Sequence, residues 1–480
     1  MTPAGPASRR ICGGCGRVVD EVALCPVCPN AGDGGDHVLL RELDEARIPF
    51  GLAGDPRFPD RPFLRWRHRL HAWHLAARRG LADADFVALV DRLERAIAEV
   101  DARPSGFVMT PLVTAPELAA EIGPTAPLGA LLLKDETGNV AGSHKARHLF
   151  GILLALEVLE VARDRPLAIA SCGNAALAAT VLAKAAGRPI RVFVPPDARH
   201  AVVRRLGDLD ADLVVCHRTP SVSGDPCVHA FRDAVADGAI PFSCQGSDNG
   251  LAIDGGETLG WEIVTQLGGA PIDRVFVQVG GGALGSAVGR ALQQAVRAGM
   301  LARMPRLHAV QTRAVHPFVR AYKRLSRRLD RALFGWAEAD PGGLVYTAER
   351  ADRLAHAYAS DAFQSQLREA VVRRGDLMWP WEDTAPSVAH GILDDETYDW
   401  LALARAMLEG GGYPIVVEEA ALVHANRLAL EHAGIAADET GTAGLAGLIA
   451  LEEVMGVRSA ALHGPRDERC LALVTGARRD

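Results

Sequence analysis

The central and C-terminal parts of the chain alternate between short aliphatic runs and longer segments whose apolar residues recur at helical spacing. Each short run is bounded by glycine, proline or charged residues and is followed by a helical pattern, which indicates repeated β-α units. Such units form a parallel sheet covered by helices, and we expect two lobes of this α/β kind. The predicted strands cover residues 131–133, 167–170, 190–194, 212–215, 275–279, 307–310 and 413–417.

Two helical stretches lie outside this alternation. An amphipathic pattern at 85–100 precedes the first predicted strand. The charge-rich segment 314–374 is interpreted as an inserted helical subdomain, either a lid or an oligomer contact. A solvated helical excursion with no role in chemistry explains the same pattern equally well.

The composition limits the kinds of partner. The chain has 480 residues, 49% of them apolar, and carries 52 Lys and Arg against 59 Asp and Glu, for a net charge of −7. That balance argues against non-specific binding to nucleic acid or anionic membranes, so a small-molecule partner is expected. The N-terminus lacks the apolar stretch of a secretory signal, and no apolar run approaches the ~20 residues of a membrane-spanning helix. We therefore expect a cytosolic protein without a membrane partner.

Four of the nine cysteines form two Cys-x-x-Cys pairs near the N-terminus, Cys12 with Cys15 and Cys25 with Cys28. Four thiolates at this spacing can close a tetrahedral zinc site, and such a closed site is structural instead of catalytic. Free thiols, or a ribbon that has lost its metal, are the alternative. The Gly/Asp-rich stretch 29–37 is typical of a linker, so we expect the ribbon to be an appendage.

These patterns divide the chain into four parts. A zinc ribbon with its linker covers 1–37, and the insertion covers 314–374. The α/β lobes take the remainder, 38–313 and 375–480.

Lys145 stands at the expected start of a helix, after a polar loop that follows the predicted strand 131–133. A helix N-terminus favours anions, so a cation placed there is locally unfavourable. The same positive end favours the neutral amine that Schiff-base chemistry requires. Taken alone, an ordinary surface lysine also explains this position.

Two further loops join a predicted strand to a helix. The first, at 171–176 with sequence SCGNAA, directs backbone N–H groups at an anion such as a carboxylate. The second, at 279–285 with sequence VGGGALG, is a glycine cluster suited to cradle a phosphate. It is not a GxxxxGK[ST] nucleotide loop, and dinucleotide binding lacks the acidic residue expected after a following strand.

Together these loops resemble the fold-type-II pyridoxal phosphate enzymes, the group of threonine synthase, serine/threonine dehydratases, cysteine synthase and the tryptophan synthase β subunit. The resemblance extends from about 109 to 451, with the motifs in the order of the family. The N-terminal ribbon is similar to that of one branch of threonine synthase-like proteins. Six motifs carry the resemblance: TPL at 110–112, GSHKAR at 142–147, SCGNAA at 171–176, DGGETLGWEI at 254–263, VGGGAL at 279–284 and DETGTAGLAG at 438–447.

The resemblance implies roles for individual residues. Lys145 would bind pyridoxal 5'-phosphate as a Schiff base and would remove the α-proton of the substrate. Asn174 would donate a hydrogen bond to the 3-oxygen of the cofactor, and Thr440 would face its pyridine nitrogen. A neutral hydroxyl there suits elimination better than transamination. The cofactor phosphate would be held by the main-chain amides of Gly280, Gly281, Gly282, Ala283 and Leu284, and the substrate carboxylate by Ser171, Cys172 and Gly173.

Four positions depart from the motifs of the family. His144 stands where many relatives have phenylalanine, and it is either near the phosphate, as in the tryptophan synthase β subunit, or a packed ring. Ala146 and His148 replace the aspartate and glycine of the KDRG motif of threonine synthases. His390 stands where the similar SIADGI loop has an acidic residue. The changes at Ala146, His148 and His390 put phosphohomoserine in doubt as the substrate.

Three further features receive a structural interpretation. Arg147 is retained from the motif and is expected to form a structural ion pair, with a substrate anion as the alternative partner. Cys172 is expected to be a small packed residue and not a nucleophile. The acidic cluster 394–396 is interpreted as solvated surface.

The resemblance implies a pyridoxal phosphate-dependent lyase that acts on a small α-amino acid by α-proton abstraction and β- or γ-elimination, with replacement of the leaving group as a variant. Threonine synthase, which converts phosphohomoserine to threonine, is the alternative activity. An alternative of another class is a non-catalytic binding or regulatory module that keeps the fold. We expect a homodimer with a small amino acid as its partner and no nucleic acid.

Overall fold

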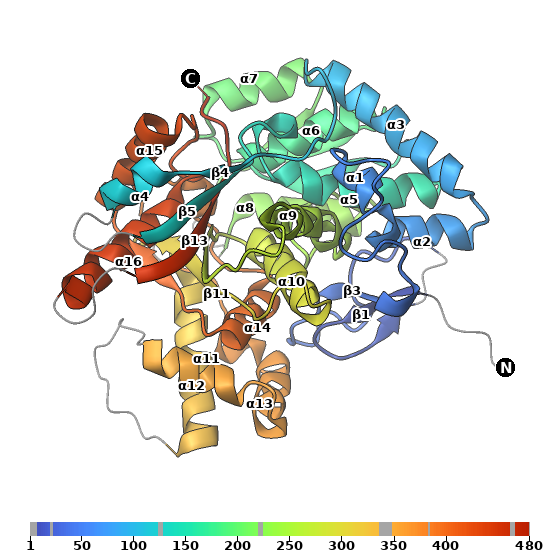
Figure 1. The fold of residues 1–480 in the computed structure, drawn as a ribbon. Coiled ribbons are helices and arrows are strands. Elements are labelled where there is room, and N and C mark those ends of the chain that lie inside the picture. The colour runs from blue at the N-terminus through green and yellow to red at the C-terminus, as the bar shows by residue number, and fades with distance from the viewer. Residues whose placement is uncertain are drawn as a thin grey trace.

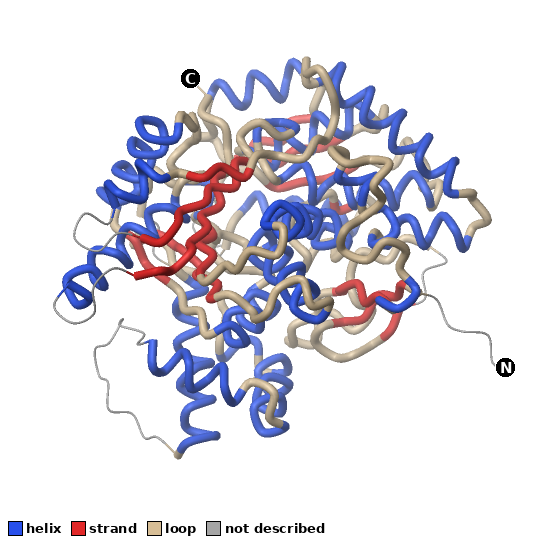
Figure 2. The backbone as a smooth tube through the Cα atoms, viewed as in Figure 1, coloured by secondary structure: helices blue, strands red, loops and turns tan. Residues whose placement is uncertain are grey.

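The computed structural model, drawn in Figure 1, describes residues 7–19, 23–122, 128–218, 224–335, 348–382, 385–460 and 466–479. Within these ranges the strands form three sheets, which appear as three groups of red segments in Figure 2. Two of the sheets are parallel or nearly so, as the β-α pattern predicts. The third is a small antiparallel sheet near the N-terminus.

The larger sheet has six strands, and every neighbouring pair is parallel except the edge strand β4 with β5. The strand β13 was not predicted, because charged residues open the segment and its aliphatic part is short. It nevertheless pairs with both β10 and β5 in the middle of the sheet. The strand order is β12 (Ile415–Val417), β11 (Arg306–Thr312), β10 (Arg274–Gln278), β13 (Arg466–Val474), β5 (Leu128–Asp135) and β4 (Leu112–Thr114).

The smaller sheet has four parallel strands, and three of them have the predicted bounds. The aliphatic side chains of β6 and β7 are largely buried, whereas β8 is an edge strand whose Val215 is exposed. Short continuous apolar runs identified all three strands. The order is β8 (Asp212–Val215), β7 (Ile190–Val194), β6 (Leu167–Ala170) and β9 (Ile240–Pro241).

Helices cover the two parallel sheets and pack between them (Figure 1). The predicted helix at 85–100 is confirmed as α3. In chain order the helices are α1 (Pro62–Arg65), α2 (His71–Arg78), α3 (Asp83–Val100), α4 (Pro116–Ile122), α5 (Lys145–Val158), α6 (Asn174–Ala185), α7 (His200–Asp208), α8 (Pro226–Ala236), α9 (Leu251–Leu267), α10 (Ala283–Arg297), α11 (Pro317–Phe334), α12 (Ala348–Ala357), α13 (Asp361–Val372), α14 (Trp400–Gly410), α15 (Glu419–Ala433) and α16 (Ala443–Ala460).

Helices α5 and α9 approach each other closely through two glycines. A Cβ on Gly255 would lie 2.2 Å from the carbonyl oxygen of Arg147, and a Cβ on Gly151 would lie 2.7 Å from the nitrogen of Gly255. Any side chain at either position would force the helices apart. This contact fixes the start of α5, and therefore Lys145, against the buried helix α9.

The helices of the segment 314–374 are packed onto the rest of the chain and gather at the bottom of the view in Figure 1. Apolar side chains from all three helices, among them Leu325, Leu354 and Phe363, belong to the main hydrophobic core. At these residues the segment is not a solvated excursion. Residues 336–347, in the middle of the predicted insertion, lie outside the described residues.

The N-terminal sheet consists of β1 (Ser8–Cys12), β2 (Val18–Val19) and β3 (Leu39–Leu43), with β1 in the centre. The prediction that this sheet is an appendage joined by a linker is wrong. The N–H of Asp36 donates to the carbonyl of Val371 on α13 at 3.0 Å, and Arg405 of α14 donates to the carbonyl of Gly13 at 3.2 Å. In the segment 29–37, Gly32 and Gly34 have positive φ angles of 106° and 86° that favour glycine, and a Cβ on Gly35 would lie 3.4 Å from the carbonyl oxygen of Val371.

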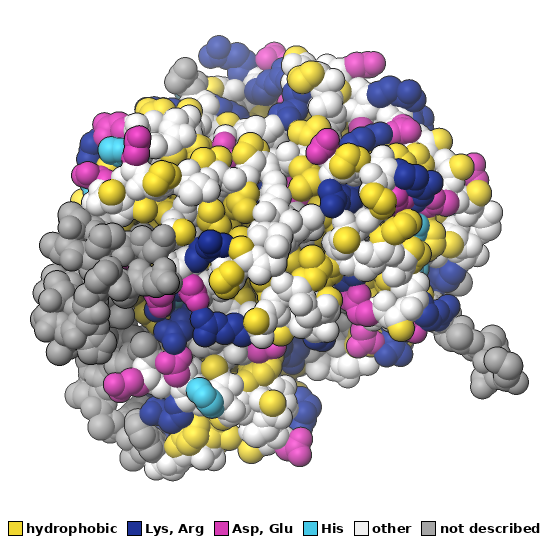
Figure 3. Space-filling view, viewed as in Figure 1, with side chains coloured by type: hydrophobic (Ala, Val, Ile, Leu, Met, Phe, Trp, Pro, Cys, Tyr) yellow, Lys and Arg dark blue, Asp and Glu magenta, His cyan; other side chains and the backbone are white. Residues whose placement is uncertain are grey.

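Among the described residues, none of the helices combines the length and the apolar character needed to cross a membrane. On the face shown in Figure 3, Lys and Arg side chains are interspersed with Asp and Glu side chains.

Candidate active site

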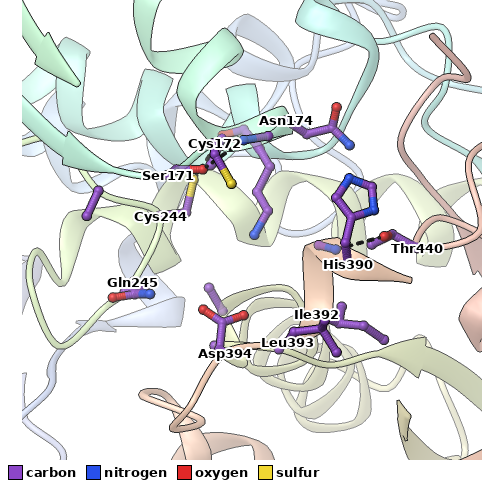
Figure 4. A pocket seen from close by; sticks show the side chains of 18 of the residues that line it. Ser171, Cys172, Asn174, Cys244, Gln245, His390, Ile392, Leu393, Asp394 and Thr440 are labelled. Atoms are coloured by element: carbon purple, nitrogen blue, oxygen red, sulfur yellow. Dashed lines mark hydrogen bonds between the residues drawn. The ribbon is translucent and has the colours of Figure 1, made fainter. Parts of the chain in front are cut away.

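A cavity of about 620 Å³ lies where loops from both parallel sheets meet. Its wall includes every residue predicted to bind a cofactor or substrate, so the structure brings all of them together. In Figure 4, Ser171, Cys172 and Asn174 lie on one side of this cavity and Asp394 lies on the opposite side. His390 and Thr440 lie at the right of the view, between these two sides. Ligands of α/β proteins bind at such junctions, at the carboxyl ends of parallel strands.

Lys145 is the first residue of α5, as the sequence predicts. The turn before it contains Ala141 and Gly142, both with positive φ angles of 51° and 68°. This turn directs the chain from β5 into the helix and leaves the Lys145 side chain half-buried in the cavity wall. The lysine is therefore accessible to a molecule in the cavity.

The ring of His144 is packed against another ring and also lines the cavity. Its ring packs edge-on against that of His148, with the centroids 5.7 Å apart, and it also contributes to the cavity wall. Burial, and then the neighbouring charge of Lys145, hold the pKa of His144 well below its ordinary value, so the ring is neutral. Its buried Nδ1 finds no hydrogen-bond partner in the described part of the chain. A neutral imidazole with a free nitrogen is suited to a polar ligand in the cavity.

The loop 171–174 follows β6 and opens α6, which begins at Asn174. The amide of Asn174 is fixed from two sides, since its Nδ2 lies 3.4 Å from an oxygen of Asp438 and its Oδ1 accepts a hydrogen bond from Arg479. Burial raises the pKa of the Cys172 thiol, which favours the protonated form over a reactive thiolate. The backbone N–H groups at the start of α6 are suited to bind an anion.

The glycine loop 280–284 connects β10 to α10, and Gly282 has a φ of 95° that favours glycine. Its carbonyls point away from the cavity, because Gly280 O accepts from Thr397 Oγ1 at 2.8 Å and Gly281 O accepts from Asp399 N at 2.9 Å. A Cβ on Gly280 would lie 2.0 Å from an oxygen of Asp394. The loop therefore accommodates only glycine there and presents main-chain N–H groups at a helix N-terminus, as a phosphate site requires.

Thr440 lies just before α16 and is almost completely buried. Its Oγ1 accepts a hydrogen bond from the N–H of Gly391 at 3.0 Å. Because the oxygen is engaged as an acceptor, the hydroxyl proton is available to an acceptor in the cavity. A pyridine nitrogen is such an acceptor.

Arg147 points away from the cavity and forms the structural ion pairs expected of it. Its guanidinium binds Glu136 at 2.8 Å and Glu262 at 2.6 Å, and all three side chains are fully buried. The same cluster includes Thr110, whose N–H donates to Glu262, and Lys134, which pairs with Glu262 at 2.8 Å. This motif residue therefore holds α5, α9 and β5 together instead of meeting a substrate.

The interpretation of 394–396 as solvated surface is wrong. Asp394 and Asp395 face the cavity, and Tyr398 donates to Asp395 at 2.7 Å. Burial raises the pKa of Asp394 to about 6, although the nearby charge of Lys145 acts in the opposite direction. The only sequence signal was their position directly after the loop 387–392 that resembles the family.

Several other residues of the cavity wall carried no sequence signal, because they come from separate elements and form no motif. They are Arg199, Arg218, Asp225, Ser243, Cys244, Gln245, Trp381, Tyr398 and Arg479.

A separate cluster of metal-ligand type lies in the N-terminal sheet. Ligand atoms of Cys12, Cys15, Cys28 and His37 all lie within 4.8 Å of one another. The predicted set differs by one residue, because the thiol of Cys25 donates to the carbonyl of Val27 at 3.2 Å and lies outside this group. His37 was missed because it belongs to a stretch that resembles a linker.

The sequence of the chain is similar to those of known proteins. The sequence model of a family described as pyridoxal-phosphate dependent enzyme matches residues 105–476. A threonine synthase of Methanosarcina acetivorans is 28% identical over 222 residues, which are 45% of this chain and 50% of that protein. The chain thus spans about half the length of this curated relative.

Solved structures share the fold. Maize serine racemase superposes with a TM-score of 0.53 at 19% identity and covers 80% of this chain and 95% of its own. The processed form of threonine deaminase isoform 2 from Solanum lycopersicum has a TM-score of 0.54 at 19% identity, with 83% and 91% covered. An L-serine ammonia-lyase from Rhizomucor miehei has a TM-score of 0.51 at 19% identity, with 77% and 94% covered. These likenesses confirm the predicted α/β architecture.

Proposed function

The chain belongs to the pyridoxal-phosphate dependent enzyme family, and we propose that it is a lyase that acts on a small α-amino acid. One observation carries this proposal: the amine-bearing residue Lys145, the glycine loop 280–284, the anion-binding loop 171–174 and Thr440 share the wall of one cavity. Each of these features comes from a different part of the chain. Their convergence matches the needs of a cofactor with an aldehyde, a phosphate and a pyridine ring.

Pyridoxal phosphate fits the donors that the cavity offers. Lys145 would hold it covalently, and the N–H groups of 280–284 would bind its phosphate. Asn174 would donate to the 3-oxygen, Thr440 to the ring nitrogen, and the unpartnered Nδ1 of His144 supplies a further polar contact. When bound, this cofactor supplies the electron sink that makes the α-proton of an attached amino acid acidic.

The residues of this cavity would then bind the substrate and move its proton. The hydroxyl of Ser171 and the N–H groups of Cys172 and Gly173 would bind the substrate carboxylate at the start of α6, where the helix dipole favours an anion. The N–H of Ser171 itself donates to the carbonyl of Phe193 at 3.2 Å. Lys145, once released from the cofactor, would take the α-proton through its Nζ. Thr440 would offer the ring nitrogen a neutral hydroxyl instead of a carboxylate, an environment that suits elimination better than transamination.

Threonine synthase is the second candidate, and two observations favour it. The threonine synthase of Methanosarcina acetivorans matches this chain in sequence. In addition, Arg199 and Arg218 line the cavity and could pair with the phosphate of a phosphorylated substrate. Against it stand the departures from the threonine synthase motifs at Ala146, His148 and His390.

The test is an absorption titration of the purified protein with threonine, serine, phosphohomoserine and β-substituted alanines, one at a time. A shift of the cofactor band names the substrate class, and assays for keto acid, ammonia and phosphate in the same sample separate lyase from synthase. We expect keto acid and ammonia. Protein that takes up no pyridoxal phosphate on incubation would contradict the proposal and favour a non-catalytic module.

The same proposal includes the organisation of the whole chain. We propose a metal-binding ribbon at 1–37, a cofactor-binding α/β part at 38–313 and 375–480, and a helical insertion at 314–374. The ribbon would hold a structural zinc ion. A homodimer in the cytosol is expected, and sedimentation equilibrium of the purified protein tests the assembly.

A further inference from the structure

We infer that Cys12, Cys15, Cys28 and His37 form one tetrahedral Zn²⁺ site, that Cys25 is not a ligand, and that Asp33 orients the imidazole of His37 for the metal. This inference is independent of the proposed lyase activity. It changes the ligand set from four cysteines to three cysteines and one histidine.

Two of the six distances between the ligand atoms match a tetrahedron around zinc, and all six are at most 4.8 Å. Zn–S bonds of about 2.3 Å and Zn–N bonds of about 2.0 Å place neighbouring ligand atoms about 3.5–3.8 Å apart. The Sγ atoms of Cys15 and Cys28 are 3.7 Å apart, and Cys12 Sγ lies 3.5 Å from Nδ1 of His37. The four groups are thus arranged to close a four-coordinate site.

The orientation of His37 is the second argument. Its Nε2 lies 2.8 Å from Asp33 Oδ1, which leaves Nδ1 as the nitrogen that faces Cys12. Asp33 is itself fixed, because the same oxygen accepts from the N–H of Gly35 at 2.8 Å. A carboxylate on the outer nitrogen is the common partner of a zinc-bound histidine, since it fixes the ring and makes it a better ligand.

The hydrogen bonds to the sulfur atoms distinguish the three proposed cysteine ligands from Cys25. Asn30 donates to two of the sulfurs, from its N–H to Cys28 and from its Nδ2 to Cys15, both at 3.4 Å. The N–H of Cys15 donates to Cys12 at 3.4 Å. Three sulfurs therefore accept N–H groups, as metal-bound thiolates do. The sulfur of Cys25 instead lies 3.2 Å from the carbonyl oxygen of Val27 and outside the group of four ligand atoms.

The site lies at a junction between the N-terminal sheet and the helical segment. Asp36, next to His37, is buried and lies 3.8 Å from the guanidinium of Arg374, which also pairs with Glu396. Glu396 follows Asp395 of the cavity wall. A metal that fixes 33–37 would thus support the loop that closes one side of the cavity.

The first test uses the full-length protein purified from zinc-containing medium. Elemental analysis should give one zinc per chain, and X-ray absorption at the zinc edge should give three sulfur neighbours and one nitrogen neighbour. The cofactor holds no sulfur and does not disturb this measurement. Four sulfur neighbours, or zinc only at trace level, would overturn the inference.

Matched substitutions give a second test that does not depend on activity. His37→Ala and Cys28→Ser should lose the zinc, whereas Cys25→Ser, a change of the same kind in the same sheet, should keep it. His37→Cys should keep one zinc with four sulfur neighbours, which guards against a loss that reflects misfolding alone. Asp33→Asn should weaken zinc binding about 10- to 100-fold in a chelator competition. Zinc loss in Cys25→Ser, or full retention in His37→Ala, would contradict the ligand set.

Discussion

The Nδ2 of Asn174 lies 3.4 Å from Oδ2 of Asp438, although 264 positions separate the two residues in the chain. Asn174 begins α6 beside the smaller parallel sheet, and Asp438 precedes α16 beside the larger one. This contact joins two parts of the cavity wall and sets the amide of Asn174 in it. A substitution at Asn174 therefore affects a group whose position depends on both sheets.

Asn174→Ala should weaken the affinity for pyridoxal phosphate about tenfold, the effect of losing one hydrogen bond of about 1.4 kcal/mol. Titration of the cofactor-free protein measures the dissociation constant. Gln293→Ala is the matched control, because it also removes a side-chain amide with one hydrogen bond, to Glu409, outside the cavity. Equal affinity in the Asn174 variant and the control would contradict a contact between Asn174 and the cofactor.

Gly280→Ala should abolish cofactor binding, because its Cβ would lie 2.0 Å from Asp394 and 3.0 Å from the Cα of Ile392. The loop would have to move, and its N–H groups would lose their alignment toward a phosphate. Gly207→Ala in α7 is the control, since a Cβ there meets nothing within 4 Å and replaces a poor helix former. Titration with pyridoxal phosphate and thermal unfolding of both variants check the prediction. Unchanged affinity in Gly280→Ala would show that the phosphate does not bind this loop.

Asp394 should make the protein less stable as the pH rises. Its pKa in the fold is raised to about 6 by burial, so between its unfolded pKa and pH 6 the folded state binds more protons than the unfolded chain. The contribution of Asp394 to the free energy of unfolding therefore falls across this range as the pH increases. In cofactor-free protein, Asp394→Asn should flatten the fall by on the order of 1 kcal/mol between pH 4 and pH 7. Urea unfolding at several pH values measures the difference, and parallel curves for the two proteins would count against the raised pKa.

Arg147→Ala should destabilise the protein by about 3–5 kcal/mol, because it leaves the buried carboxylate of Glu136 without a cation and Glu262 with Lys134 alone. Arg9→Ala removes an exposed ion pair with Glu42 and should change the stability by less than about 1 kcal/mol. Denaturant unfolding of both variants gives the comparison. An Arg147 variant of normal stability that fails to bind substrate would instead place this residue in the substrate site.

Part of this structure follows from local sequence. The strands β6, β7 and β8 were predictable because a continuous aliphatic run between breakers is typical of a buried parallel strand. The loops that line the cavity were predictable because strand-to-helix junctions place helix N-termini at one edge of a sheet.

The remainder depends on contacts between distant residues. The strand β13 begins with charged residues, and its place between β10 and β5 follows from pairing with strands far away in sequence. Asp394 reaches the cavity because it packs on Gly280, and His37 reaches the metal-ligand cluster because β3 pairs with β1. The local sequence around Asp394 and around His37 does not indicate either contact.

The most direct test of the central claim is the visible absorption spectrum of Lys145→Ala after incubation with pyridoxal phosphate and removal of the free cofactor. The account predicts that the absorption band of the lysine-bound cofactor is absent from this variant. It should remain in Lys184→Ala, which removes a surface lysine paired with Asp210. Circular dichroism should show that both variants are folded. A band of unchanged position and intensity in Lys145→Ala would contradict the assignment of Lys145 as the residue that holds the cofactor.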